Sequence, residues 1–139
     1  MLTRKRKRAT ALIMVVDDDD AVRLMARETL EHCGYAVWDA SSGTLALEVF
    51  EEKCPDIVLL DVMMPGLDGF DTMRIIRQLE GYKSLPIVAV TAKAMSGDRE
   101  RCLEAGANDY IAKPVNVDVL IATLWRTLQG QGQTPLQTQ

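Results

Sequence analysis

The sequence has little of several features that would assign it to other classes of protein. Its three cysteines, Cys33, Cys54 and Cys102, are an odd number without a CxxC pair, so they suit reduced structural thiols better than a disulfide framework or a zinc site. The only histidine, His32, is expected at the surface. The longest uncharged run near the N-terminus, residues 9–16, is far too short to cross a bilayer, and there is no signal-peptide pattern. We therefore expect a cytoplasmic protein without a membrane partner.

Basic charge is concentrated in one short segment. Residues 4–8 (Arg-Lys-Arg-Lys-Arg) hold five of the 16 basic residues, so the rest of the chain is more acidic than the net charge of −4 suggests. Such a segment can contact nucleic acid or anionic lipid. We interpret 1–10 instead as a disordered leader and expect no nucleic-acid partner. Residues 130–139, rich in Gln, Gly and Thr, are expected to be a disordered tail, which leaves one domain over 11–129.

Between these ends, strand-like apolar runs alternate with segments of helical periodicity. Strands are expected over 12–16, 35–40, 57–61, 86–91 and 110–113. A helix should follow each: the first stopped by Gly34, the second between Ser41 or Ser42 and Pro55, and the others over 70–79, 96–106 and 117–128. Five such units predict an α/β fold. Its parallel sheet would have the flavodoxin-like strand order 2-1-3-4-5, covered by helices on both sides as a three-layer (βα)5 sandwich.

Helical spacing also predicts which side chains face the sheet. Cys33 falls on the inner stripe of the first helix and Val117 on that of the last, whereas Arg74 and Arg77 should point outward from the third. Trp125 lies off the apolar stripe of the last helix. It either marks a partner surface or packs against a neighbouring helix.

Polar side chains stand where four of the predicted strands end. Asp17 and Asp18 follow the first strand, Asp61 ends the third, Thr91 ends the fourth and Lys113 ends the fifth. The carboxyl ends of the strands in an open parallel sheet lie at one edge, where ligands bind. We therefore expect these five side chains to converge.

Converging carboxylates repel one another unless a cation joins them, and oxygen ligands favour Mg²⁺. Asp18 and Asp61 are predicted as direct ligands, Asp17 as a ligand through water, and Met63 as a ligand through its carbonyl. Asp61 can attack a phosphorus as a carboxylate nucleophile and form an acyl phosphate. The strand-end lysine and hydroxyl would contact the phosphoryl oxygens. The pattern predicts Mg²⁺-assisted phosphoryl transfer to Asp61.

These strand ends resemble the receiver domains of two-component response regulators, chemotaxis regulators among them, and the resemblance runs from about Leu12 to Leu128. The matching segments are Val15-Val16-Asp17-Asp18, Leu60-Asp61-Val62-Met63-Met64-Pro65-Gly66, Val90-Thr91-Ala92 and Lys113-Pro114. Residues 91–99 look most like receivers of hybrid kinases and some cell-cycle regulators. The resemblance implies that Asp61 accepts phosphate from the phosphohistidine of a sensor histidine kinase or histidine phosphotransfer protein.

The resemblance also implies how the phosphoryl group is sensed. Thr91 would swing toward it and Tyr110 would change rotamer to follow. The fourth helix, fifth strand and fifth helix would form the surface that binds a downstream protein. The Lys113–Pro114 bond is expected to be cis, and Met63 and Lys93 are expected to tune hydrolysis of the acyl phosphate.

Three other classes of protein share part of this pattern. A haloacid-dehalogenase-like Mg²⁺-dependent phosphatase also uses a nucleophilic Asp, but it needs a second Asp two residues later, where this chain has Met63. A flavodoxin-like binding module would need a Gly/Ser/Thr-rich phosphate loop after the first strand, which this sequence lacks. A nucleic-acid-binding protein led by residues 4–8 would bind DNA with a steep salt dependence.

We expect instead a single receiver domain that catalyses only its own phosphorylation and dephosphorylation. We also expect no output domain, because the sequence leaves no room for one after Leu128. The domain is either free-standing or excised from a hybrid kinase, and the initial Met and basic leader favour the former.

Overall fold

One parallel sheet organises the molecule. The computed structural model describes residues 10–92 and 96–130, so the basic segment at 4–8, Lys93 and the tail from 131 lie outside the described residues. The sheet has the order β2-β1-β3-β4-β5, which confirms the predicted topology. Its strands are β1 (Leu12–Val16), β2 (Ala36–Ala40), β3 (Ile57–Asp61), β4 (Ile87–Thr91) and β5 (Asp109–Ala112).

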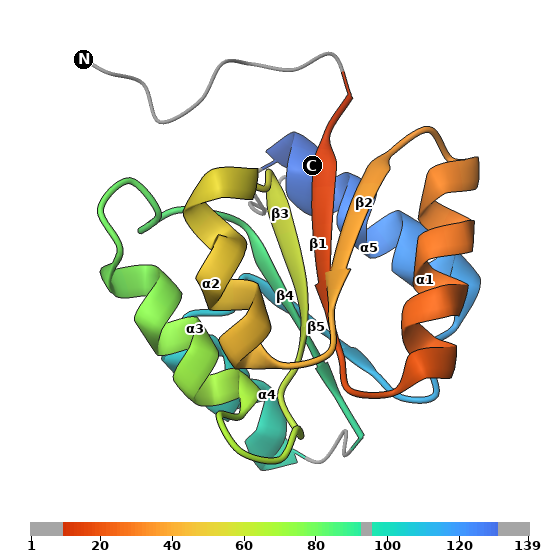
Figure 1. Cartoon of the computed structure of the whole chain (residues 1–139). Helices are drawn as coiled ribbons and strands as arrows, with labels where there is room; N and C mark the ends of the chain where they lie inside the picture. Colours follow the sequence, from red (N-terminus) through yellow and green to blue (C-terminus); the bar gives the residue numbers. More distant parts are fainter. Residues whose placement is uncertain (1–9, 93–95, 131–139) are drawn as a thin grey trace.

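Helices cover both faces of this sheet and complete the predicted three-layer sandwich. They are α1 (Asp20–His32), α2 (Gly43–Lys53), α3 (Gly69–Gln78), α4 (Ser96–Ala105) and α5 (Val117–Gly130). Helices α1 and α5 lie on one face, and α2, α3 and α4 lie on the other (Figure 1). In the part of the chain that the structure describes, no helix has both the length and the hydrophobicity that crossing a membrane requires.

The central strands are apolar along their whole length because both of their faces are covered. Every residue of β3 and β4 is buried. Successive side chains of a strand point to opposite faces, so Ile57 and Leu59 pack with α1 and α5 whereas Val58 and Leu60 pack with α2, α3 and α4. The strands are therefore held on both sides, and the residues at their ends have little freedom to move.

Polar caps begin three helices just beyond the ends of strands. The side chain of Asp19 accepts hydrogen bonds from the first turn of α1, Ser42 does so for α2, and Asp68 for α3. Each cap satisfies backbone N–H groups that have no partner within the helix. The caps fix the helix starts at the same edge of the sheet as the strand-end polar residues.

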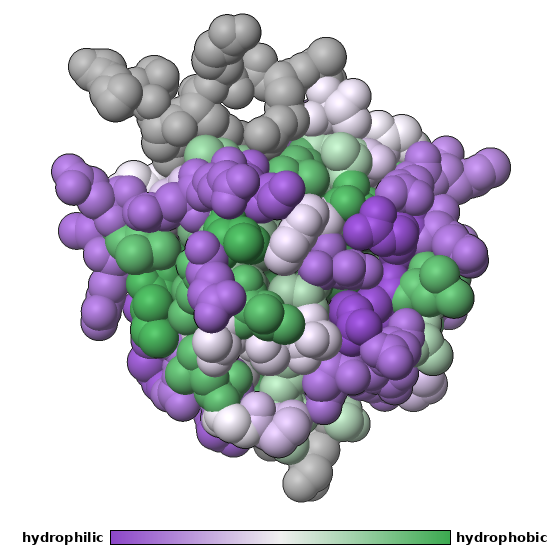
Figure 2. Space-filling model, in the orientation of Figure 1, coloured by the Kyte–Doolittle hydropathy of each residue, from purple (hydrophilic) through white to green (hydrophobic). Residues whose placement is uncertain are grey.

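Large apolar side chains reach the surface at scattered places. The surface over α1 is mostly hydrophilic, and over α2 and α3 it is mixed (Figure 2). Trp125 on α5 is 57% exposed, so it lies off the apolar stripe as predicted and is not buried against a neighbouring helix. Whether Trp125 binds a partner stays a prediction.

Two predicted inward positions lie at the surface instead. Cys33 is exposed because α1 ends at His32 and Cys33 is its C-terminal cap, and Val117 is exposed as the first residue of α5. The buried face of α5 includes Thr123 and Thr127. The Thr127 hydroxyl donates to the Thr123 carbonyl at 2.7 Å, so an apolar pattern alone could not identify these positions.

The prediction that Arg77 points outward is wrong. Its half-buried guanidinium donates to the carbonyl of Gly106 from Nε at 3.1 Å and from Nη2 at 2.7 Å, and to the carbonyl of Tyr82 at 3.0 Å. It also donates at 3.0 Å to Oδ1 of Asn108, and this oxygen accepts a second hydrogen bond from the backbone N–H of Ile87. Burial lowers the pKa of Arg77. The side chain ties α3 to the turn between α4 and β5.

Replacing this arginine should cost more stability than replacing its neighbour on the same helix. Arg77→Met removes every guanidinium hydrogen bond to the part-buried carbonyls of Gly106 and Tyr82, so we expect the free energy of unfolding to fall by about 2 kcal/mol or more. Arg74→Met is the matched control, because exposed Arg74 makes one surface ion pair with Asp71 at 3.2 Å, which is worth about 0–1 kcal/mol. Urea denaturation measures both. Equal losses would show that the buried hydrogen bonds of Arg77 add no stability.

Candidate functional site

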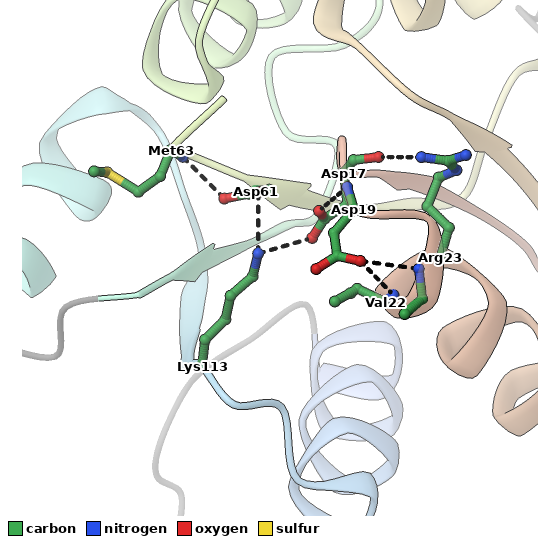
Figure 3. Close-up of polar contacts among 8 residues, drawn as sticks. Asp17, Asp19, Val22, Arg23, Asp61, Met63 and Lys113 are labelled. Atoms are coloured by element: carbon green, nitrogen blue, oxygen red, sulfur yellow. Dashed lines mark hydrogen bonds and ion pairs between the residues drawn. The ribbon is translucent and has the colours of Figure 1, made fainter. Parts of the chain in front are cut away.

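The strand-end residues converge at one edge of the sheet, as the sequence predicts. Asp61 is the last residue of β3 and Thr91 the last of β4, and both are buried. Lys113 follows β5, whose last residue, Ala112, pairs with Thr91. Asp17 follows β1 and is buried as well. Strands β1, β3, β4 and β5 therefore supply the polar groups of one site, and Figure 3 shows those of Asp17, Asp61 and Lys113.

Lys113 joins the two buried carboxylates. Its Nζ lies 3.2 Å from Oδ2 of Asp61 and 3.3 Å from Oδ2 of Asp17 (Figure 3). Burial disfavours the charged ammonium, but the two carboxylates outweigh that effect and raise the pKa of Lys113. The lysine therefore stays positively charged.

Asp17 is electrostatically unusual. Burial raises its pKa, the Asp61 carboxylate raises it further, and the hydrogen bond from the backbone N–H of Asp19 and the charge of Lys113 oppose the rise. The net result is a pKa of about 6. The ionised form of Asp17 is thus costly even with Lys113 paired to its carboxylate.

The backbone around Asp61 positions its carboxylate. Its Oδ1 accepts the N–H of Met63 at 2.9 Å, and the Met63 side chain is half exposed. Helix α3 begins so close to this backbone that a Cβ on Gly69 would collide with the carbonyl of Asp61 and the Cα of Val62. The absence of a side chain at Gly69 lets α3 pack where it holds the β3–α3 loop over the site.

The acidic residues fit a hard divalent cation. One carboxylate oxygen each from Asp17, Asp18 and Asp61 lies within 4.8 Å of the other two. Three carboxylates exceed the single charge of Lys113, and an all-oxygen donor set suits Mg²⁺. Asp18 is exposed, whereas Asp17 is buried and paired with Lys113. The division into direct and water-mediated ligands, and the role of the Met63 carbonyl, stay predictions.

Thr91 and Tyr110 lie on the same face of the sheet. Tyr110 pairs with Ala89, two residues before Thr91 on β4, so both side chains face α4. Tyr110 is half buried and packs against the core beneath α2, α3 and α4. The Lys113–Pro114 bond is cis, as predicted.

Sequence reasoning missed Arg23, which contacts the acidic loop. Its Nη1 donates to the backbone carbonyl of Asp17 at 2.8 Å, and its Nη2 bonds Oδ1 of Asp20. The i,i+3 spacing of Asp20 and Arg23 was the available signal. Nothing in the sequence indicates the bond to the carbonyl, because it depends on how the chain turns between β1 and α1.

Known proteins share this arrangement. Residues 13–125 match the response regulator receiver domain family. The chain is 39% identical over 117 residues to the transcriptional regulatory protein AfsQ1 of Streptomyces coelicolor, covering 84% of this chain and 51% of that protein. It is 34% identical over 115 residues to the polar-differentiation response regulator DivK of Brucella ovis, covering 83% and 94%. The chain thus spans about half the length of AfsQ1 and nearly all of DivK.

Solved structures agree. The chemotaxis protein CheY4 of Vibrio cholerae superposes with a TM-score of 0.81 at 32% identity, covering 85% of this chain and 98% of that one. The receiver domain of the sensor histidine kinase PA1611 of Pseudomonas aeruginosa, solved with a magnesium ion coordinated in its active-site cleft, gives 0.80 at 37% identity, covering 88% and 100%. With its family match, strand order and strand-end acids, this chain belongs to the response regulator receiver domains.

Proposed function

We propose that residues 11–129 form the phosphoacceptor domain of a cytoplasmic two-component phosphorelay. Asp61 receives the phosphoryl group from a phosphohistidine of a histidine kinase or phosphotransfer protein. The observation that carries this proposal is the placement of Asp61. Its buried carboxylate ends β3 with one oxygen held by Met63 N–H and the other by Lys113, beside two further acids.

The reaction requires a nucleophile and groups that compensate charge. A carboxylate oxygen of Asp61 bonds to phosphorus as the P–N bond of the donor breaks, and that electron pair leaves with the imidazole, which takes up a proton. The Lys113 ammonium is in place to neutralise phosphoryl oxygens, and the Thr91 hydroxyl can donate to one of them. A bound Mg²⁺ would neutralise further charge and align donor with acceptor, held by Asp17, Asp18, Asp61 and the carbonyl of Met63.

The phosphatase alternative has no support in this chain. It requires an acid/base carboxylate two residues after the nucleophile, and Met63 occupies that position. The family match is to receiver domains. Catalysis is therefore proposed to be limited to phosphorylation and dephosphorylation of the chain itself.

We further propose that the signal leaves through the face formed by α4, β5 and α5, where a downstream protein binds. Thr91 ends β4 and Lys113 directly follows β5, and the chain forms α4 between these two strands. A phosphoryl group that draws both side chains toward itself pulls on that face, and Tyr110 packs beside it. A ligand shifts an equilibrium only through contacts that differ between the two states, and these contacts supply the difference.

The acceptor assignment predicts that one residue carries the label. Treatment with acetyl phosphate and Mg²⁺ should add one phosphoryl group to the wild-type protein, because Asp61 ends β3 with its carboxylate oriented by the N–H of Met63 and placed beside Lys113 and two further acids. Intact-mass measurement should find no label on Asp61→Asn and normal labelling of Asp71→Asn, an exposed aspartate on α3. Undiminished labelling of Asp61→Asn would overturn the assignment.

The raised pKa of Asp17 predicts a stability that depends on pH. The folded pKa of about 6 lies above the ordinary value of 3.8 for an aspartate, so the folded protein binds the proton more tightly than the unfolded chain does. The resulting destabilisation is full above about pH 6 and disappears as the pH falls toward 4. Without Mg²⁺, Asp17→Asn should raise the free energy of unfolding at pH 7 by on the order of 1–3 kcal/mol.

Denaturation in urea at several pH values tests this expectation. The increase in the free energy of unfolding caused by Asp17→Asn should shrink as the pH falls from 7 to 4. The control is Asp118→Asn, which replaces an exposed aspartate in the first turn of α5. A gain that stays constant over this range would contradict the raised pKa.

The proposed switch predicts long-range effects that need the Thr91 hydroxyl. Amide chemical shifts on adding beryllofluoride and Mg²⁺ should change from Asp61 to Tyr110 and across 96–125, with a coupling of about 1–3 kcal/mol. Thr91→Ala should keep the changes near Asp61 and lose most distant ones, whereas Thr91→Ser should keep both. If the shift changes in the wild-type protein are confined to the loops around Asp61, the domain accepts a phosphoryl group without changing the face formed by α4, β5 and α5.

A further inference from the structure

We propose that Arg23 is a positioning residue for the acidic site and that it acts by fixing the peptide group between Asp17 and Asp18. The inference rests on the proposed function of the site. It assigns a role to a residue of α1 that supplies no metal ligand and no nucleophile.

The contact is directed at the backbone. Arg23 lies one turn into α1, its side chain is only 18% exposed, and its Nη1 donates to the carbonyl oxygen of Asp17 at 2.8 Å. It approaches Asp17 from the side away from Lys113 (Figure 3). The backbone of Asp17 and its carboxylate are therefore held by different cations.

That carbonyl belongs to the peptide plane that joins Asp17 to Asp18. A change in the ψ angle of Asp17 would move this carbonyl and would turn the Cα–Cβ bond of Asp18 relative to Asp17. The Asp17 side chain has its own restraints, because Lys113 contacts Oδ2 and the N–H of Asp19 donates to Oδ1 at 2.9 Å. Asp18 is exposed, so its direction depends mainly on the backbone. Arg23 thus sets the direction in which Asp18 meets the other two carboxylates.

The second bond of the guanidinium explains why the side chain is arginine. Its two Nη atoms contact two acceptors, the Asp17 carbonyl in the β1–α1 loop and the Asp20 carboxylate at the start of α1. A lysine cannot present two donors in a fixed plane. Asp20 is 91% exposed. Because an ion pair in water contributes little, the bond to the carbonyl is the one on which the role depends.

Two effects of Arg23 on a bound cation have opposite signs. Its positive charge repels Mg²⁺, so removing the charge alone would make Mg²⁺ bind more tightly. Its hydrogen bond to the Asp17 carbonyl orients the ligands. Loss of a group that orients metal ligands typically weakens metal binding about 10–100-fold. The sign of the change on removing Arg23 therefore separates positioning from a purely electrostatic influence.

The experiment measures the Mg²⁺ dissociation constant by amide-shift titration of the full chain. Arg23→Met should raise the constant about tenfold or more, Arg23→Lys should give an intermediate value, and Asp20→Ala should stay near wild type. Arg27→Met is the matched control, because Arg27 is on the same helix and carries the same charge but contacts Glu31 and Asp39 instead. It should not weaken Mg²⁺ binding.

Affinity equal to or tighter than wild type in folded Arg23→Met would overturn the inference, as would equal weakening in Arg27→Met. Circular dichroism checks folding, and if Arg23→Met does not fold, Arg23→Lys must show the weakened binding by itself. Phosphoryl labelling separates the two proposals. A wild-type protein that binds Mg²⁺ but takes no label on Asp61 refutes the proposed function alone. Normal labelling with unchanged affinity in the Arg23 variants refutes the positioning role alone.

Discussion

The shared ammonium of Lys113 is the interaction around which this site is organised. Asp17 and Asp61 are buried side by side, and Lys113 contacts both. Buried charges are expensive unless each one is paired, and here one cation serves two anions. Burial, and after it the neighbouring Asp61 carboxylate, raise the pKa of Asp17. A divalent cation would balance the remaining negative charge. The uncompensated carboxylates therefore favour metal binding for the same reason that they destabilise the site without a metal.

The scaffold makes this arrangement possible because its two edges differ. The central strands are buried on both faces and hold their terminal residues at fixed positions. At the edge where these strands end, the last strand residues and the short loops after them carry acids, a hydroxyl and a lysine. At the opposite edge Arg77 satisfies the carbonyls of Gly106 and Tyr82 and ties α3 to the α4–β5 turn. The edge at the carboxyl ends of the strands therefore carries the functional groups, and the hydrogen bonds of Arg77 at the opposite edge hold neighbouring elements together.

The division of the site among four strands also explains how a local chemical change can reach a surface. No single loop carries the polar groups, so a phosphoryl group on Asp61 would alter contacts at the ends of β1, β4 and β5 together. Thr91 and Tyr110 share one face of the β4–β5 pair, next to α4. Packed elements move between discrete arrangements and do not deform gradually, which allows a small displacement to become a switch.

The sequence by itself determined the strand order and the residues at the strand ends. Apolar runs and helical spacing are local patterns, and a parallel sheet places all carboxyl ends at one edge, so Asp61, Thr91 and Lys113 could be located without coordinates. Only the tertiary structure decided the burial of Arg77 and the exposure of Cys33. It also decided the pairing of Lys113 with Asp17 and Asp61 and the hydrogen bond from Arg23 to the carbonyl of Asp17. The contacts of Arg77, Lys113 and Arg23 depend on which distant atoms lie beside a flexible side chain, and the exposure of Cys33 depends on where α1 ends. Periodicity carries no information about either.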